Sequence, residues 1–228
     1  MNIDWHIHSD DDTLAQALAQ TVATDLAAAI AARGQALIAL SGGSTPRRFM
    51  EALAQQSIDW SKVIVTLVDE RWVPPTHPRS NAGLLDKHFL RDAATAARFE
   101  PLYVDAPTPE SALPTVTAHV KALPLPFDVV VLGMGTNGHT ASFFPGGDHL
   151  AEALDPKGEA PVLPMRAPEA GEPRITLTLP VLIAAPKLYL QIEGAKKRHV
   201  LEEAADGVDY PMRAVLEAAP QLQVYWCE

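Results

Sequence analysis

Four short runs of residues that are apolar at nearly every position constrain this fold more than any other feature of the sequence. A strand exposed on one side alternates apolar and polar residues, whereas a strand inside a parallel sheet is covered on both faces and is apolar throughout. The runs are Ala36–Leu40, Val63–Val68, Phe127–Leu132 and Leu188–Ile192. We therefore predict that these runs are parallel strands, with a last strand at Leu222–Trp226.

Helical segments are expected between these runs, because their apolar residues recur with the spacing of a helix rather than of a strand. The segments are Arg47–Ala54, Asn81–Leu90, Glu110–Ala122 and Lys196–Ala205. Alternation of strands and helices is typical of a parallel sheet with helices on both faces. The sequence therefore predicts a three-layer α/β fold with a mainly parallel sheet.

A longer helix is predicted at Thr13–Ala32. Large apolar residues recur there every four positions with alanines between them, which places a buried stripe along one side of the helix. The acidic residues 10–12 supply a cap and favourable charge at its start, and Gly34 ends it. The Gln, Thr and Asp residues within this apolar segment argue against a membrane span.

Residues 154–172 differ from the rest of the chain. They contain prolines at positions 156, 161, 164 and 168, and they show no periodicity. We interpret this stretch as a long excursion or flap, or equally as a surface loop, and not as a linker between domains. A single α/β domain is therefore expected over residues 1–228.

Charge and cysteine content exclude several classes of protein. The chain has 18 Lys and Arg against 28 Asp and Glu, a formal net charge of −10, whereas non-specific nucleic-acid binding needs clustered positive charge. The single cysteine, Cys227, can form no internal disulfide, and no cysteine cluster could hold zinc or an iron–sulfur cluster. The N-terminal residues lack the basic and apolar regions of a signal peptide. We expect a cytoplasmic protein with no nucleic-acid or membrane partner.

Ligands of parallel α/β sheets bind outside the carboxyl ends of the strands, so the segments that follow each strand are the first candidates for a site. The first strand is followed by Ser41-Gly42-Gly43-Ser44-Thr45-Pro46. Glycines let backbone N–H groups approach an anion, and the next helix contributes the partial positive charge of its N-terminus. The segment fits a phosphate loop, although a tight turn capped by Ser and Thr would have the same composition.

Two further strands are also followed by polar segments. Asp69-Glu70-Arg71 comes after the second strand, where Arg71 could clamp a phosphate or a carboxylate, or could pair with its acidic neighbours at the sheet edge. The segment Gly133–Ser142 is rich in glycine and delivers His139, a side chain suited to general-base chemistry near neutral pH. We favour a functional role for His139 over that of an ordinary surface or core histidine.

A local basic cluster lies in the C-terminal third of this acidic chain. Arg174 precedes an apolar segment, and Gly194 begins a helix that carries Lys196, Lys197 and Arg198. The cluster indicates either an anion-binding site at a strand-to-helix junction or a solvated basic helix face. No serine-hydrolase elbow of the form Gly-x-Ser-x-Gly is present.

Taken in order, these segments resemble the motif set of the 6-phosphogluconolactonases. The matching segments are SGGSTP, VDERWVP, LGMGTNGHTASFFPG, RITLTLPVL and EGAKK, spread over residues 36–205. Each motif is weak by itself, but their common order is specific. The wider superfamily also contains glucosamine-6-phosphate deaminase/isomerases and the sugar-phosphate sensor domains of some bacterial regulators.

The resemblance implies a Rossmann-like α/β sandwich that uses no metal and no cofactor, and that acts on a small sugar-phosphate lactone. We also expect a monomer. The implied reaction is hydrolysis of 6-phospho-D-glucono-1,5-lactone to 6-phosphogluconate in the oxidative pentose phosphate pathway. His139 corresponds to the general base of the family, and Arg71 to an arginine at the substrate. The implied phosphate-binding residues are Ser41, Gly42, Gly43, Ser44, Thr45, Arg174 and Lys197, and the implied supporting residues are Asp69, Asn137 and Gly138.

Two positions bear on the function. The family usually has Asp-Gly-His-Thr where this chain has Asn137-Gly138-His139-Thr140, so the activity depends on whether the family's aspartate acts by shape or by charge. The deaminase/isomerases carry a glutamate five positions after this histidine, and here that position is Phe144. The residue therefore favours a lactonase over an isomerase.

Two alternatives remain at this point. The chain could be an amino-sugar-phosphate isomerase/deaminase, against which Phe144 argues, or a sugar-phosphate sensor without catalysis. Such sensors are usually attached to a DNA-binding domain, for which this chain has neither a spare segment nor the basic charge. In the expected mechanism, neutral His139 activates water, and Arg71 with N–H groups of the Gly133–Gly138 loop stabilises the oxyanion.

Overall fold

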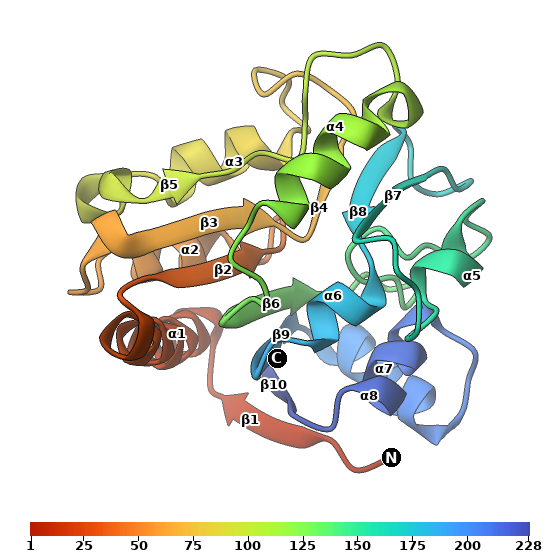
Figure 1. Ribbon diagram of the computed structural model, residues 1–228. Coiled ribbons are helices and arrows are strands. Elements are labelled where there is room, and N and C mark those ends of the chain that lie inside the picture. Colours follow the sequence, from red (N-terminus) through yellow and green to blue (C-terminus); the bar gives the residue numbers. More distant parts are fainter.

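A computed structural model describes all of residues 1–228, and its largest element is a parallel sheet (Figure 1). The strands lie in the order β1-β10-β9-β6-β2-β3-β5, and every neighbouring pair is parallel. Their bounds are β1 Asp4–His8, β2 Ala36–Leu40, β3 Val63–Leu67, β5 Arg98–Phe99, β6 Val129–Gly133, β9 Lys187–Glu193 and β10 Leu222–Cys227. The predicted mainly parallel sheet is therefore confirmed.

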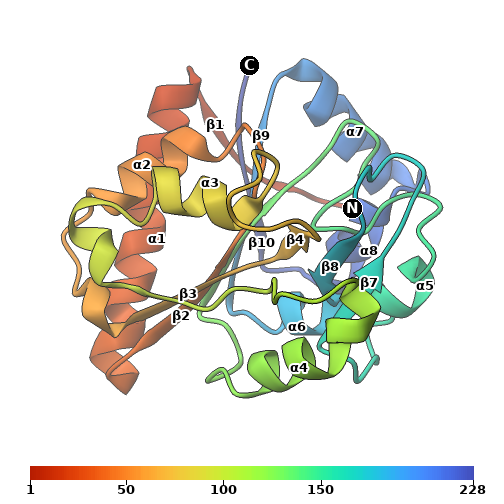
Figure 2. The same ribbon diagram turned by 90° about the horizontal axis from the view of Figure 1, so that it is seen from above.

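The apolar runs form the centre of this sheet because both of its faces are covered. Every residue of β2 and β3 is buried, as expected for strands between two layers of helices. Helices α1, α2 and α3 lie on one side of these strands, and α4 and α6 lie on the other (Figures 1 and 2). Strand order reverses between β2 and β6, so the segments after these two strands diverge at the carboxyl edge of the sheet.

The helices follow the predicted pattern closely. Their bounds are α1 Asp11–Arg33, α2 Arg47–Ala54, α3 Asn81–His88, α4 Pro109–Lys121, α5 Leu150–Ala153, α6 Leu179–Ile183, α7 Ala195–Asp206 and α8 Pro211–Ala218, with short 3-10 turns at Trp60–Lys62 and Asp92–Ala96. Pro46 is the N-cap of α2, which begins at Arg47 as predicted. Helices α5 and α6 are too short for their periodicity to be seen in the sequence, and α8 was not predicted.

Helix α1 shows how local sequence determines an element. The side chain of Asp10 accepts a hydrogen bond from the backbone N–H of Thr13, and Gly34 ends the helix in the left-handed conformation. The helix is long and apolar enough to cross a membrane by length and composition alone. Its stripe of Leu14, Leu18, Val22 and Leu26, however, is completely buried in the core of the protein. The helix is therefore packed as a core element of an α/β fold.

A second sheet corrects the interpretation of residues 154–172. Strands β4 (Asp69–Arg71), β8 (Arg174–Leu177) and β7 (Val162–Met165) form a three-stranded antiparallel sheet. Strand β7 lies inside the stretch that the sequence presents as irregular, and all four of its residues are buried. The prolines conceal it, because Pro161 and Pro164 interrupt the pattern by which a strand is recognised.

Two further elements differ from the prediction. Asp69-Glu70-Arg71, which was expected only as a polar segment after a strand, forms a strand of its own, because the chain passes from β3 into the antiparallel sheet. Strand β1 was not predicted at all, and it pairs with β10 at the edge of the parallel sheet. None of its residues is fully buried, as expected for a strand at the edge of a sheet.

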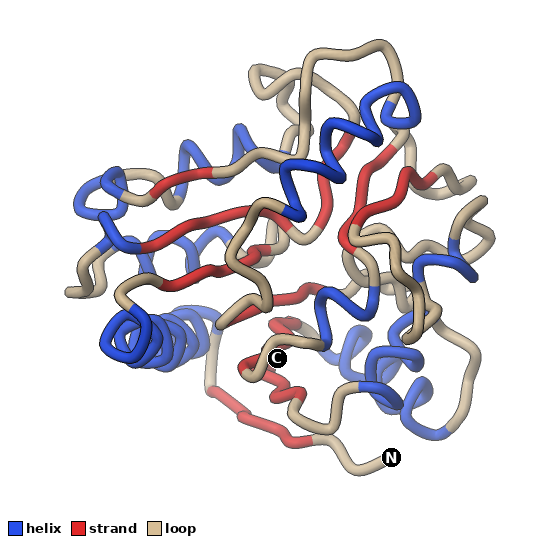
Figure 3. The backbone as a smooth tube through the Cα atoms, viewed as in Figure 1, coloured by secondary structure: helices blue, strands red, loops and turns tan.

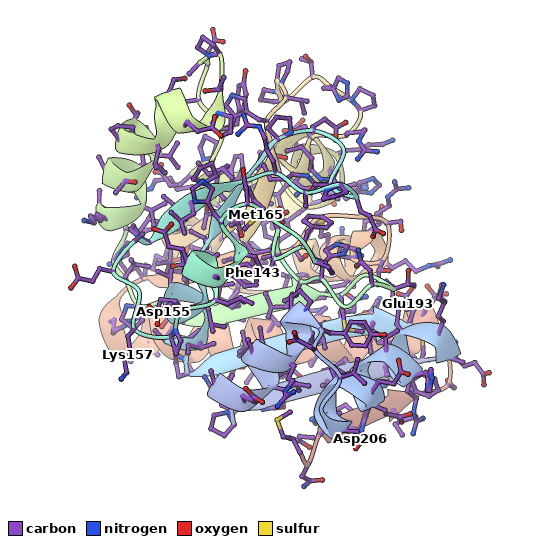
Figure 4. All side chains as sticks on the ribbon, turned by 90° about the vertical axis from the view of Figure 1, so that its right-hand side faces the viewer. Phe143, Asp155, Lys157, Met165, Glu193 and Asp206 are labelled. Atoms are coloured by element: carbon purple, nitrogen blue, oxygen red, sulfur yellow. The ribbon has the colours of Figure 1, made fainter.

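The surface is polar and the interior is continuous across the two sheets. Phe143 and Met165 have no exposed area, whereas Asp155 and Lys157 lie at the edge of the molecule in Figure 4. The segment between β6 and α5 contains no regular helix or strand (Figure 3). This irregular segment carries His139 and borders the site described next.

Candidate active site

A cavity of about 190 Å³ lies at the carboxyl edge of the parallel sheet, where the segments after β2 and β6 diverge. Its polar lining comes from both sheets, from the loops before α2 and α5, and from the first turns of α3 and α7. The polar and charged lining residues are Ser41, Ser44, Thr45, Asp69, Arg71, Asn81, His139, Arg174, Gln191 and Lys197, with Gly42, Gly43, Gly133 and Gly135 between them. The cavity thus brings together residues that lie far apart in the chain, from Ser41 after β2 to Lys197 in α7.

The loop Ser41–Thr45 forms one wall of this cavity. The backbone N–H of Ser41 donates to the carbonyl of Val131, which ties the start of the loop to β6. Gly43 has a φ of 104°, a conformation that favours glycine, so this loop adopts a backbone that other residues rarely adopt. A side chain at Gly42 would collide with Asn81, because a Cβ there would lie 2.0 Å from Asn81 Oδ1. Gly43 is therefore explained by its backbone conformation, and Gly42 by the lack of space for a side chain.

Lys197 reaches the same loop from the first turn of α7. Its Nζ lies 3.3 Å from Thr45 Oγ1. Burial lowers the pKa of Lys197, and the nearby carboxylate of Glu193 opposes this effect. Its neighbour Lys196 is exposed, so only one of the two lysines faces the cavity.

Arg174 and Asp69 form a buried ion pair at the back of the cavity. Arg174 Nη1 lies 3.5 Å from Asp69 Oδ2, and only 6% of each side chain is exposed. Asp69 Oδ2 also accepts a hydrogen bond of 2.5 Å from the hydroxyl of Ser142, and Arg174 Nη2 donates to the carbonyl of Ala170 at 2.7 Å. Burial lowers the pKa of the Arg174 guanidinium, while Asp69 opposes that shift.

The two arginines present unused donors to the site. Arg71 Nη1 donates to the carbonyl of Arg79, but Arg71 Nε and Arg174 Nε are buried and have no hydrogen-bond partner. A buried donor without a partner costs about 1 to 3 kcal/mol. Both arginines line the cavity, so an anion bound there could accept from these groups. The site is therefore electrostatically prepared for a negatively charged ligand, in a chain that is negative overall.

Glu70 holds the strand and helix that present Arg71 and Asn81. Its completely buried carboxylate accepts from the backbone N–H groups of Arg71, Asn81 and Ala82, and from the hydroxyl of Ser80. Burial raises the pKa of Glu70, and the three backbone hydrogen bonds counteract this effect. The N-terminus of α3 is thus capped by a side chain of β4, which positions one side of the cavity.

His139 lies half-buried in the irregular segment after β6. Its Nδ1 lies 2.5 Å from Asn137 Oδ1, and its backbone N–H donates to the same oxygen at 3.2 Å. An amide oxygen can only accept, so this contact places the ring proton on Nδ1 and leaves the lone pair on Nε2. Burial lowers the pKa of His139 to about 4, with Arg174 and Lys197 contributing, so the imidazole is neutral at pH 7.

Phe144 forms the surface on which the imidazole rests. The two rings are stacked with their centroids 4.1 Å apart, and the guanidinium of Arg174 lies over Phe144 with 5.1 Å to its centroid. Phe144 is 3% exposed. No carboxylate is therefore presented by this position, where the isomerase pattern has a glutamate.

Gly138, between Asn137 and His139, has a φ of 74° and leaves no room for a side chain. A Cβ at this position would lie 2.5 Å from the Cβ of Tyr210. The Gly138 carbonyl accepts from the backbone N–H of Met212 at 3.0 Å. The glycine thus lets the loop that carries His139 pack directly on the segment before α8.

The structure brings together all of the residues that were predicted to bind or react. His139, Arg71, Arg174 and Lys197 line the cavity together with the loop Ser41–Thr45 and Asp69, whereas Asn137 and Gly138 lie behind His139. Sequence reasoning missed Gln191, whose Oε1 is buried without a partner beside this cavity. A polar residue in the otherwise apolar run Leu188–Ile192 was the available signal. It also missed Glu169, for which the sequence contains no signal.

The fold and this site define a class of enzymes that act on sugar phosphates. The family model of glucosamine-6-phosphate isomerases/6-phosphogluconolactonase matches residues 9–226, and the chain belongs to this family. A 6-phosphogluconolactonase of Rhizobium meliloti is 52% identical over 230 residues, which cover 99% of both chains. The similarity therefore extends over the whole site and not only over its motifs.

Solved structures agree with this assignment. A 6-phosphogluconolactonase from Shewanella baltica superimposes with a TM-score of 0.96 at 36% identity, covering 100% of this chain and 98% of the other. A monomeric glucosamine-6-phosphate deaminase also superimposes, with a TM-score of 0.79 at 17% identity over 99% of this chain and 98% of the other. The second likeness shows only that the fold is shared, so the choice between lactonase and deaminase depends on the site.

Proposed function

We propose that this protein hydrolyses 6-phospho-D-glucono-1,5-lactone to 6-phospho-D-gluconate. The observation that carries the proposal is the position of neutral His139 in one cavity with two arginines that have unused donors and with Lys197. A base and a set of anion-binding groups are what hydrolysis of a phosphorylated ester requires. Relatives that carry the name 6-phosphogluconolactonase support the same activity.

The phosphate is assigned to the side of the cavity formed by the loop Ser41–Thr45, Lys197 and Arg174. The loop offers backbone N–H groups, and Lys197 already contacts the hydroxyl of Thr45. Binding energy from this remote group holds the lactone carbonyl in place and lowers the entropic cost of the reaction. A lactone without the phosphate should therefore react poorly.

His139 is the proposed general base. Its Nε2 takes a proton from a water molecule as that water attacks C1 of the lactone, so a C1–O bond forms and the carbonyl oxygen becomes an oxyanion. Collapse of this tetrahedral intermediate breaks the bond between C1 and the ring oxygen. The imidazolium returns its proton to the ring oxygen, which leaves as the hydroxyl of the open-chain acid. Protons balance over the cycle without a cofactor.

Arg71 and the N–H groups of the Gly133–Gly138 loop are the proposed stabilisers of the oxyanion. Arg71 lines the cavity with a buried Nε that has no partner, so it can donate to a charge that develops there. Donors that are already oriented contribute most, because they need no reorganisation during the reaction. Asp69 supports this arrangement by neutralising Arg174 behind the site.

A histidine with a pKa of about 4 is a weak base, and bound substrate should raise this pKa. Arg174 and Lys197 both lower the pKa of His139 by repelling the imidazolium. A bound phosphate dianion neutralises these charges and adds its own attraction for the imidazolium. The pKa of His139 therefore rises when the substrate is bound, which increases its strength as a base at the moment it is needed.

A deaminase activity has less support in this site. An isomerase must move protons between two carbons, and the position that carries a glutamate in that pattern holds Phe144, stacked on His139. We also propose a cytoplasmic protein that acts as a monomer on a small sugar-phosphate lactone. No cluster of three or more His, Cys, Asp or Glu side chains is arranged to hold a metal ion.

The test is hydrolysis of freshly generated 6-phosphogluconolactone, coupled to 6-phosphogluconate dehydrogenase and compared with spontaneous opening. We expect clear acceleration by the protein, and loss of about 10²-fold or more of kcat in His139→Gln. Acceleration that survives in His139→Gln would remove this residue from the mechanism. A folded protein that binds 6-phosphogluconate without accelerating hydrolysis would instead be a sugar-phosphate sensor, and release of ammonia from glucosamine 6-phosphate would indicate a deaminase.

A further inference from the structure

Glu169 contacts the partner of the proposed base from a distant part of the chain. Its Oε2 accepts a hydrogen bond of 2.5 Å from Asn137 Nδ2, and the Oδ1 of the same amide lies 2.5 Å from His139 Nδ1. Three side chains thus form a continuous line from a carboxylate to an imidazole. Glu169 lies in the connection between β7 and β8, a segment with no other role in the proposed mechanism.

The segment that carries Glu169 is tied to the protein on both sides of this residue. The backbone of Arg166 exchanges hydrogen bonds with Asp148 on one side. On the other side Arg174 donates to the carbonyl of Ala170, and Glu172 forms an ion pair of 2.6 Å with Arg79. The backbone position of Glu169 is therefore determined by its neighbours, and its side chain accepts the hydrogen bond from Asn137.

The amide of Asn137 presents a problem that a carboxylate would not. An amide has a donor end and an acceptor end of almost the same shape, so it can turn over. With Oδ1 toward His139, the ring proton lies on Nδ1 and Nε2 is the base. With Nδ2 toward His139, Nδ1 would accept and the proton would move to Nε2, which could then take no proton from water.

Glu169 removes this ambiguity. A carboxylate only accepts, so it stabilises the amide orientation in which Nδ2 points to Glu169 and Oδ1 points to His139. The backbone N–H of His139, which donates to Oδ1 at 3.2 Å, favours the same orientation. The charge of Glu169 also raises the pKa of His139, in opposition to burial. Its effect passes through the amide, so Glu169 would act as a positioning residue.

From this geometry we infer that Glu169 is a positioning residue that selects the base-competent tautomer of His139 through the amide of Asn137. The inference rests on the proposed general base. It assigns to the β7–β8 connection a function in catalysis, and it accounts for activity in a chain that has Asn beside the histidine. Asn137 supplies the oriented acceptor for His139 Nδ1, and Glu169 supplies a negative charge on the far side of the amide.

The tautomer can be observed without any activity assay. Histidine NMR with 15N labelling distinguishes a protonated Nδ1 from a protonated Nε2, and His139→Gln identifies the signal of His139. At neutral pH we expect the Nδ1–H form in the native protein and a mixture of both tautomers in Glu169→Ala. An unchanged tautomer in Glu169→Ala would overturn the inference, whatever the enzyme does with the lactone.

The second measurement is a pair of substitutions in two backgrounds. In the native background, Glu169→Ala should lower kcat by about 3- to 10-fold and leave KM nearly unchanged, as expected for loss of orientation in a base. Glu169→Gln keeps an acceptor for Asn137 and should retain more activity than Glu169→Ala. In Asn137→Asp both side-chain oxygens accept, so rotation of the group no longer exchanges a donor for an acceptor. The substitution also places the carboxylates of residues 137 and 169 in contact. Removing Glu169 from the Asn137→Asp protein should therefore raise kcat.

The effect of Glu169→Ala on kcat should thus be opposite with Asn and with Asp at position 137. This difference distinguishes a residue that positions the amide from one that only supports the loop. Arg166→Ala is the matched control, since Arg166 pairs with Glu110 at the start of the same connection and touches neither Asn137 nor His139. Its effect should be the same in both backgrounds. If Glu169→Ala lowers kcat by the same factor with Asn or Asp at position 137, Glu169 only holds the loop and the inference is wrong. If the native protein shows no lactonase activity, the proposed function fails, whereas the NMR experiment still decides whether Glu169 selects the tautomer of His139.

Discussion

Lys197 Nζ lies 3.3 Å from Thr45 Oγ1, although the two residues are 152 positions apart in the chain. The contact joins the first turn of α7 to the glycine-containing loop before α2, at the carboxyl edge of two strands of the same sheet. Partial burial of the ammonium lowers its pKa, since the charge lacks full hydration. A bound phosphate would restore favourable contacts to this charge, which makes Lys197 the sharpest test of where the phosphate binds.

Lys197→Ala should raise KM for the phosphorylated lactone by about 10- to 100-fold, with a smaller change in kcat. The reason is loss of a charge-assisted contact worth about 1.5 to 3 kcal/mol. Steady-state kinetics with and without the phosphate on the substrate measure the effect. The control is Lys196→Ala, because Lys196 is exposed one position earlier. Equal effects of the two substitutions would place the phosphate elsewhere.

The pKa of His139 should rise when the product binds. In the free protein its pKa is about 4, lowered first by burial and then by Arg174 and Lys197. 6-Phosphogluconate brings a phosphate and a carboxylate into the cavity, and both favour the imidazolium. Histidine NMR titration with and without this product measures the change. A pKa that stays constant or falls would show that the product does not bind beside His139.

Stability should depend on pH through the same residue. Unfolded His139 titrates near its ordinary value of 6.5, whereas the folded residue titrates near 4. Between these values the unfolded chain binds more protons, so the free energy of unfolding falls as the pH is lowered from about 6.5 to 4. The loss attributable to this partly buried residue is up to about 3 kcal/mol. Urea unfolding at several pH values should show a shallower loss in His139→Gln than in the native protein.

Asp69→Asn should destabilise the protein by about 3 kcal/mol and weaken substrate binding. The substitution leaves Arg174, which is 5% exposed, without its carboxylate partner, and an uncompensated buried charge is costly. Urea unfolding at neutral pH measures the first effect and KM the second. Asp155→Asn, at an exposed position, should change neither. A stable Asp69→Asn variant would show that Arg174 is neutralised by other groups.

Gly42→Ala should disturb the phosphate loop by contact and not by backbone conformation. The added Cβ would lie 2.0 Å from Oδ1 of Asn81. This side chain is buried, and its Nδ2 donates a hydrogen bond to the carbonyl of Asp69. We expect KM to rise by about 10-fold or more, with a loss of about 1 to 3 kcal/mol in stability. Adding Asn81→Ser shortens the opposing side chain and should recover part of both losses. Without any recovery, the collision with Asn81 would not be the cause.

Much of the scaffold follows from local sequence. Runs that are apolar on both faces require burial on both sides, so they predicted the central parallel strands, and cap residues such as Asp10 and Gly34 predicted the limits of α1. The same logic placed SGGSTP and GTNGHT at strand ends, where the carboxyl edge of a sheet makes ligand sites. Resemblance to a known motif set then assigned roles to these segments, and those roles remain proposals for this chain.

Other features were decided only by tertiary structure. Strand β7 carries a proline and an irregular pattern, and it is a strand because β8 supplies its hydrogen-bond partners and the core covers it. Asp69 looks in sequence like a partner of Arg71. The antiparallel pairing of β4 with β8 sets Arg174 opposite Arg71, and the Arg174 side chain pairs with Asp69 two positions along β4. Neither pairing can be read locally, since each depends on which distant strand lies alongside.

The contact between Glu169 and Asn137 belongs to the same category. Nothing in the proline-rich stretch marks Glu169 as different from other exposed acids, and only the path of the β7–β8 connection brings it to the amide beside His139. The sequence by itself determined the elements and the chemical groups, because propensity, capping and burial act over a few residues. Tertiary structure determined which charges meet, because hydrogen bonds and ion pairs form between side chains whose separation in space is set by the packing of both sheets.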